Sequence, residues 1–231
     1  MGLLLPSVFE APLFPLPGVV LYPGMMLPLH IFEPRYRRML ADALAGEKMI
    51  AMGHLRSANG TGPAEPSEVY EILGVGRIAA HEELADGTSN IALVGLARCR
   101  LRREPQAQPY RIATLSPLKD FPLKGAALQK RAQAVREALR SAADTLMRRT
   151  IKLEAREVLY KSLEERTELG SSSDFLAGLF IRDPAQRQRL LENLDPLERG
   201  EEVRQTLERF AAGLEPEPPP VTGRLDEFST N

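Results

Sequence analysis

Five side chains capable of acid-base or anion chemistry lie close together near the start of the chain. The stretch "LPLHIFEPRYRRML" (residues 27–40) carries His30, Glu33, Arg35, Tyr36 and Arg37. A histidine beside a glutamate is the minimum for general acid-base catalysis, provided that both side chains converge in a cleft. On a strand, however, His30 shares a face with Pro28 and Phe32, because side chains alternate between the two faces.

The same residues also suit a corner between a strand and a helix. Proline is well tolerated in a first helical turn, so Glu33-Pro34 predicts a helix start there, with Glu33 as its cap. Arg35 then pairs with a carboxylate or with loop carbonyls, and the ring of Tyr36 packs against the core. We favour this structural interpretation over catalysis, and a binding role remains for whichever members are exposed: Glu33, Arg35 and Tyr36.

Residues 11–118 have the pattern of short strands and turns around this corner. Apolar runs of strand length occupy 48–55, 70–84, 89–96 and 110–118. Gly74 and Gly76 suggest a bulge or bend, and Asp86-Gly87 indicates a hairpin. The helix predicted over 33–46 has one apolar stripe, and the turn-rich segment 57–68 is expected to be an exposed loop.

The pattern changes to helices from about residue 124. Leu128, Ala132, Val135 and later apolar residues recur every three or four positions, which predicts a long amphipathic helix with a break near Thr150. The run 170–174, "GSSSD", is expected to break a helix and to cap the next one. Asp183-Pro184 and Asp195-Pro196 predict two more helix starts.

We therefore predict an α+β fold with three parts. Residues 1–120 form a small closed or half-closed sheet with an inserted helix, residues 121–214 form a small α-helical bundle subdomain, and residues 215–231 form a Pro-rich tail.

Composition excludes several classes of function. The 231 residues carry 30 basic and 31 acidic side chains, so no global field favours nucleic acid or an acidic membrane. Cys99 is the single cysteine and alternates with arginines on its strand, which predicts a buried thiol. His54 and His81 lack metal-ligand spacing, so we expect no metal and no cofactor. With no signal peptide and no membrane-spanning run, a cytoplasmic protein is expected.

The ordered segments resemble the Lon protease N-terminal, substrate-binding domain. The similar pieces are "FPLPGVVLYPGMMLPLHIFEPRYRRML", "YEILGVGRI", "DGTSNIALVGLARCRL" and "DFLAGLF" with the helices after it. "HIFEPRY" is similar to the stand-alone bacterial branch of the family. The resemblance implies a PUA-like β-barrel in the first part. The phosphate-binding pattern G-x-x-x-x-G-K-[ST] is absent, so the binding part without the ATPase or peptidase is implied.

These observations predict a non-enzymatic module that binds unfolded or extended polypeptide and has a protease or chaperone as a further partner. A partly exposed apolar groove between the two parts is the expected route, with Met25, Met26 and Leu27 as its patch. The alternative is an RNA-binding protein that uses the basic helix segment 130–149 and the basic strand residues, although no aromatic side chain is interleaved with the latter. Those residues are Arg98, Arg100, Arg102 and Arg103.

Overall fold

The computed structural model describes residues 5–56, 68–104 and 109–213. Contacts between Cα atoms divide the chain into two compact units at Lys119 and Asp120, here called the β unit and the helical unit. The loop expected at 57–68 and the tail expected at 215–231 lie largely or wholly outside the described residues. Each unit is described by itself.

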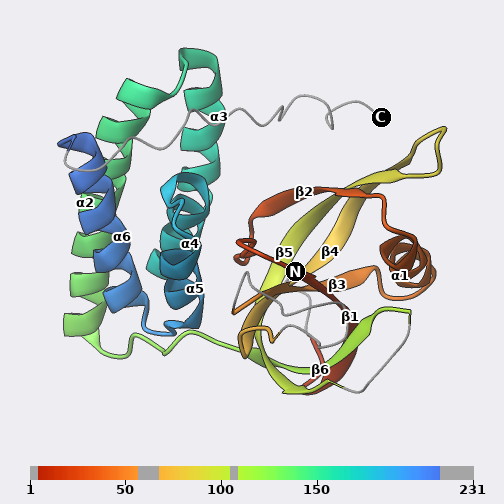
Figure 1. Ribbon diagram of the computed structural model, residues 1–231. Coiled ribbons are helices and arrows are strands. Elements are labelled where there is room, and N and C mark those ends of the chain that lie inside the picture. Colours follow the sequence, from red (N-terminus) through yellow and green to blue (C-terminus); the bar gives the residue numbers. More distant parts are fainter. Residues whose placement is uncertain (1–4, 57–67, 105–108, 214–231) are drawn as a thin grey trace. The chain divides into compact units, whose positions relative to one another are not determined.

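The β unit contains six strands and one helix (Figure 1). In chain order they are β1 (Phe9–Leu16), β2 (Met26–Ile31), α1 (Pro34–Ala45), β3 (Met49–His54), β4 (Ile72–Glu83), β5 (Ser89–Arg103) and β6 (Arg111–Leu118). The expected helix and each of the four expected strands are therefore confirmed. The strand expected at 89–96 continues to Arg103, so the alternating arginines belong to the same long strand, β5.

The sheet order is β2-β5-β4-β3-β1-β6, and β5 also pairs with β6. All of these pairings are antiparallel except β1 with β3, which is parallel. The first half of β5 is bonded to β2, and its second half is bonded to β6. Five strands thus form a closed circuit of pairings, while β2 is added to the circuit at an edge.

The irregularity expected near Gly74 and Gly76 is present in β4. The register between β4 and β5 shifts between Val75 and Gly76. Gly74 is required for a different reason, because a Cβ atom there would lie 1.9 Å from the carbonyl oxygen of Leu21. The chain that enters β2 therefore crosses the sheet at a distance that only glycine permits.

Both faces of the central strands are covered by apolar side chains. One cluster joins α1 to the sheet and includes Phe14, Tyr36 and Met39. The other cluster includes Leu13, Val75 and Cys99. Neighbours such as Leu13 and Phe14 point to opposite faces, so the strands have two buried sides and show little polar alternation.

The helical unit makes the fold a mixed α+β architecture. It contains α2 (Ala126–Thr150), α3 (Leu153–Glu164), α4 (Leu169–Phe180), α5 (Pro184–Glu192) and α6 (Pro196–Ala211). α2 runs alongside α6, which also packs against α4 (Figure 1). Asp183 and Asp195 cap α5 and α6 as predicted, each accepting two backbone N–H groups. Among the described residues, no helix is long and apolar enough to cross a membrane.

The prediction that residues 170–174 interrupt a helix was wrong. These residues lie inside α4, and the break comes earlier, between Glu164 and Leu169. Serine hydroxyls in a helix can bond to carbonyls of the preceding turn, which removes their preference for a cap. The Ser173 hydroxyl donates to the carbonyl of Leu169 at 2.7 Å, and Ser171 donates to that of Glu168 at 3.0 Å.

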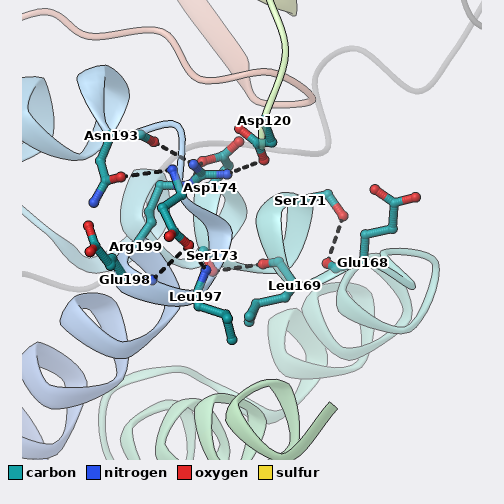
Figure 2. A network of polar contacts seen from close by, with 11 residues as sticks. Asp120, Glu168, Leu169, Ser171, Ser173, Asp174, Asn193, Leu197, Glu198 and Arg199 are labelled. Atoms are coloured by element: carbon teal, nitrogen blue, oxygen red, sulfur yellow. Dashed lines mark hydrogen bonds and ion pairs between the residues drawn. The ribbon is translucent and has the colours of Figure 1, made fainter. Parts of the chain in front are cut away.

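A buried arginine joins separate segments of the helical unit (Figure 2). The side chain of Arg199, on α6, is 0% exposed and its guanidinium contacts two carboxylates, Asp120 at 2.5 Å and Asp174 at 3.1 Å. It also donates to the carbonyl of Asn193 at 2.5 Å. One guanidinium therefore contacts three separate segments: the segment before α2, the middle of α4 and the turn between α5 and α6.

We predict that Arg199→Met lowers the free energy of unfolding by about 3–5 kcal/mol, because it removes the positive charge that lies against the buried Asp174 carboxylate. The double variant Arg199→Met/Asp174→Leu is expected to recover much of this loss, since both charges are then removed. Chemical denaturation provides the measurement. Arg189→Met is the matched control, because its side chain is 62% exposed and its ion pair with Glu202 contributes at most about 1 kcal/mol. An equal loss in the control, or no recovery in the double variant, contradicts the prediction.

Candidate functional site

An apolar surface lies on the exposed face of β2. Met26, Pro28 and His30 are exposed along the strand, and Phe32 follows at its end; we call these four residues the β2 face. Met26 is 48% exposed and Phe32 is 61% exposed. The alternate residues Leu27 and Leu29 point the other way and pack against the cluster under α1. One strand thus supplies both core side chains and an exposed apolar row.

β2 reaches this position because it is the edge strand of the sheet. It is bonded to β5 on one side, from Met26 opposite Val94 to Ile31 opposite Ser89. Within the part of the chain that the structure describes, it has no second strand neighbour. Pro28 lies in the middle of the strand, which is compatible with an edge because proline has no N–H to donate.

A row of polar side chains starts at His30 of the β2 face and continues across the two neighbouring strands, β5 and β4. His30 lies opposite Asn90, which lies opposite Glu82. The His30 Nδ1 atom is 2.9 Å from Asn90 Oδ1, and Asn90 donates to Glu82 at 3.1 Å. Because a carbonyl oxygen only accepts, Nδ1 of His30 carries the proton in this arrangement. The His30 and Phe32 rings lie 6.0 Å apart at an angle of 22°. This row therefore holds the imidazole beside the phenyl ring.

The hairpin between β4 and β5 brings Asp86 near His30. Asp86 accepts hydrogen bonds from the hydroxyl and the backbone N–H of Thr88, at 2.7 and 2.9 Å. These bonds hold the pKa of the Asp86 carboxyl below its ordinary value, and the nearby His30 adds to the effect. The hairpin predicted from Asp86-Gly87 is confirmed.

The corner after β2 is a structural element, as its sequence predicts. The ring of Tyr36 is buried and packs against Phe14, with ring centroids 4.3 Å apart. Burial is the main cause that raises the pKa of Tyr36. Arg35 pairs with Glu33 at 2.9 Å, and its guanidinium lies 4.5 Å from the centroid of the Tyr36 ring. His30 and Glu33 have different partners, so they do not form an acid-base pair.

The prediction that Glu33 caps α1 holds for its position and not for its side chain. Glu33 occupies the N-cap, and its carbonyl accepts the N–H groups of Tyr36 and Arg37. Its carboxylate makes no capping hydrogen bond and pairs with Arg35 instead. Short side chains such as Asp and Ser suit the cap better, because their oxygen reaches back to the helix N–H groups.

The predicted patch of Met25, Met26 and Leu27 is divided by the strand. Met26 is exposed, whereas Met25 and Leu27 are half-buried against the core cluster. The sequence argument did not include Pro28, His30 and Phe32 in that patch. The available signal was the period of two from Met26 to Phe32, which was hard to use because the alternate positions are apolar too.

The basic strand does not form one exposed patch. Arg98 is buried, at 4% exposed, so it does not contribute to the nucleic-acid patch of the alternative hypothesis. Alternation separates the two faces of a strand but does not show that either one is exposed. Arg100 lies 4.0 Å from Glu71, and Arg102 donates to the hydroxyl of Ser116 at 2.7 Å. Only Arg103 remains exposed and without a partner within the described residues.

No catalytic or metal-binding group emerges among the residues described. The Cys99 thiol is buried as expected, and burial raises its pKa to about 12. A thiol with that pKa is protonated near neutral pH and is a poor nucleophile. Within 5–56, 68–104 and 109–213, no three His, Cys, Asp or Glu side chains are grouped as a metal site requires.

The chain belongs to the family of the ATP-dependent protease La (LON) substrate-binding domain, whose family model matches residues 10–209. The resemblance inferred from the sequence is thereby confirmed. The match includes the β2 face, α1 and nearly all of β1 and α6.

Curated relatives are Lon proteases of bacteria. The chain is 28% identical over 200 residues to the Lon protease of Trichlorobacter lovleyi, which covers 86% of this chain and 24% of the relative. It is 26% identical over 207 residues to the Lon protease of Dictyoglomus thermophilum, covering 88% of this chain and 25% of that protein. The chain thus spans about a quarter of the length of these relatives.

Solved structures of similar fold are Lon N-terminal domains. The N-terminal domain of the Mycobacterium avium complex Lon protease matches with a TM-score of 0.65 and 16% identity, covering 86% of this chain and 98% of that one. A Lon N-terminal domain protein from Xanthomonas campestris matches with a TM-score of 0.56 and 21% identity, covering 84% and 96% of the two chains. At these identities the matches support the fold alone.

Two substitutions test the structural role of the corner. We predict that Tyr36→Ala lowers the free energy of unfolding by about 3–5 kcal/mol, because a buried aromatic ring is lost. Arg35→Ala is expected to cost less than about 1 kcal/mol, since its side chain is 55% exposed. Chemical denaturation of the two variants is compared with the parent chain. A small loss for Tyr36→Ala together with weakened polypeptide binding would assign this residue to binding instead.

Proposed function

We propose that this chain is a non-enzymatic module that binds unfolded or extended polypeptide through the β2 face. The observation that carries the proposal is the exposed apolar row of Met26, Pro28 and Phe32 in a member of a substrate-binding family. Contiguous exposed apolar side chains are the usual mark of a surface that contacts other chains. Met26 adds an adaptable side chain, which suits partners of varied sequence.

Binding to the face of β2 is better supported than addition of a strand to its edge. An added strand takes its affinity from hydrogen bonds with successive backbone groups of the edge. Pro28 interrupts that row of donors at the middle of the strand. The ligand would therefore place apolar side chains against Met26 and Phe32, with Glu33 and Arg35 at the end of the surface offering one charge of each sign.

Several finer expectations belong to the same proposal. The circuit of pairings through β5, β4, β3, β1 and β6 supports a PUA-like barrel in the β unit. A cytoplasmic location and a protease or chaperone that receives the bound polypeptide are inferred from the family. The RNA-binding alternative lacks a supporting observation, because the arginines of β5 are buried or partnered at three of four positions.

The β2 face can be tested with polar substitutions. We predict that Met26→Ser/Phe32→Ser weakens binding of fluorescently labelled, reduced and carboxymethylated casein by at least about tenfold, since each side chain contributes roughly 1 kcal/mol when it is covered. Fluorescence anisotropy measures the dissociation constants. Both residues are about half exposed, so the melting temperature is expected to change little.

Leu153→Ser/Val158→Ser is the matched control, because these α3 side chains are 61% and 53% exposed. The control is expected to bind casein like the parent chain. Equal weakening in both variants, or none in the first, would contradict a site on the β2 face.

Absence of catalysis is tested directly. Purified chain incubated with ATP and denatured casein is expected to release no phosphate and to leave casein intact, because the sequence has no phosphate-binding loop. Phosphate release and gel electrophoresis are the measurements. Turnover that co-purifies with this chain and disappears in a variant of one of its residues would refute the proposal.

A further inference from the structure

The helical unit contains a pocket of about 480 Å³ that lies apart from the β2 face in sequence. It is formed by residues 120–123, by the first half of α2, by residues 167–170 at the start of α4 and by Pro196 at the start of α6. Ligand pockets in proteins have volumes of about 300–1,000 Å³, so this one is large enough for a few residues of peptide.

Part of the pocket lining is apolar. Ala132, Leu169 and Pro196 line the pocket and are buried. Phe121 also lines the pocket and is 59% exposed, so its ring is open to contact with a ligand. Its backbone N–H donates to the carbonyl of Leu194 at 2.8 Å, so its position is fixed although its ring is not covered.

Polar side chains of α2 form another part of the pocket lining. Gln129, Gln133 and Arg136 share one face of the helix, and seven residues of helix extend over about 10 Å. The Gln129 amide makes no side-chain hydrogen bond within the described residues, and Gln133 uses only its Nε2, to Glu137 at 3.0 Å. Arg136 uses Nη1 to bond the carbonyl of Thr167. Hydrogen-bond donors and acceptors of Gln129 and Gln133 therefore remain available to a ligand, beside the apolar residues of the lining.

The charge of the lining limits the class of ligand. Asp120 and Glu168 carry carboxylates and Arg136 carries a guanidinium, which leaves one net negative charge. A phosphate or an acidic group is disfavoured there. A neutral or basic ligand with alternating donors and acceptors fits, and each residue of a peptide backbone supplies one of each.

We propose that this pocket is a second polypeptide site, which takes a short extended segment with an apolar side chain and neutral or basic neighbours. The apolar side chain lies on Ala132 and Leu169 beside Phe121, and the backbone of the segment hydrogen-bonds Gln129 and Gln133. This inference rests on the proposed function, from which it takes the ligand class. Two sites on one chain bind a long unfolded polypeptide more tightly than either site alone.

The arginine network fixes one part of the pocket lining. Asp120 is held by Arg199 at 2.5 Å and lies directly before Phe121. A Cβ atom at Gly170 would lie 2.3 Å from the Asp120 carboxylate. Glycine at position 170 therefore lets the Asp120 carboxylate lie against the first turn of α4. The position of Asp120 in turn constrains the position of Phe121, the next residue in the chain.

The test uses two-dimensional amide NMR of the full chain with blocked tripeptides. N-acetyl-Gly-Phe-Lys-amide is compared with its counterparts in which Ser replaces Phe or Glu replaces Lys, each at up to about 5 mM because so small a ligand binds weakly. We expect amide shifts within 120–136 and 167–170, with the Phe-Lys peptide binding at least about fivefold more tightly than either counterpart.

Phe121→Ser is expected to weaken this binding by at least about fivefold. The matched control is Leu128→Ser, which removes a 41% exposed apolar side chain of α2 that does not line the pocket. It is expected to leave binding unchanged. Absence of shifts in these residues, equal binding of the serine peptide, or equal effects of the two substitutions would overturn the inference.

The casein and tripeptide measurements distinguish failure of the β2 face from failure of the pocket. If casein binds through the β2 face while no tripeptide shifts the pocket amides, the inference fails and the proposed function stands. If Met26→Ser/Phe32→Ser leaves casein binding intact while the tripeptide shifts the pocket amides, the β2 face is wrong and the pocket stands.

Discussion

The buried guanidinium of Arg199 is the interaction on which the helical unit depends. It contacts carboxylates from two segments that are far apart in the chain, Asp120 and Asp174, and a carbonyl of the turn before α6. Burying such a group is costly unless all its partners are in place, so the three segments must assemble together. Asp120 also lines the pocket, and the next residue in the chain, Phe121, is another lining residue. Stability and the candidate ligand site are thus linked through one side chain.

Most of the regular elements were predictable from the sequence because their signals are local. The stripe from Tyr36 to Ala43 predicts α1, and Asp183-Pro184 predicts the start of α5. The Gly-Ser-Ser-Ser-Asp run misled because its composition favours a loop, whereas the fold gives each hydroxyl a carbonyl partner and gives Asp174 an arginine. Those partners include a residue on another helix, and local propensity contains no information about it.

The candidate sites were less predictable than the fold. Met26 was identified, but Pro28 and Phe32 were not, because β2 has apolar residues on both faces and the sequence does not tell which face is covered. Arg98 is a charged residue that is buried, although charged residues that alternate with apolar ones along a strand suggest an exposed face. The pocket of the helical unit is built from four separate segments, so no single stretch of sequence carries its signal.

An exposed apolar row on an edge strand raises a further physical question, since such an edge invites pairing with other chains and aggregation. Pro28 gives an answer, because it removes a backbone donor from the middle of the free edge while it leaves the apolar face intact. The edge is thereby a poor template for a new strand, and the face remains open to side-chain contacts. Contacts of that kind depend weakly on the sequence of the ligand. The proposed function, which is to bind polypeptides of varied sequence, requires this property.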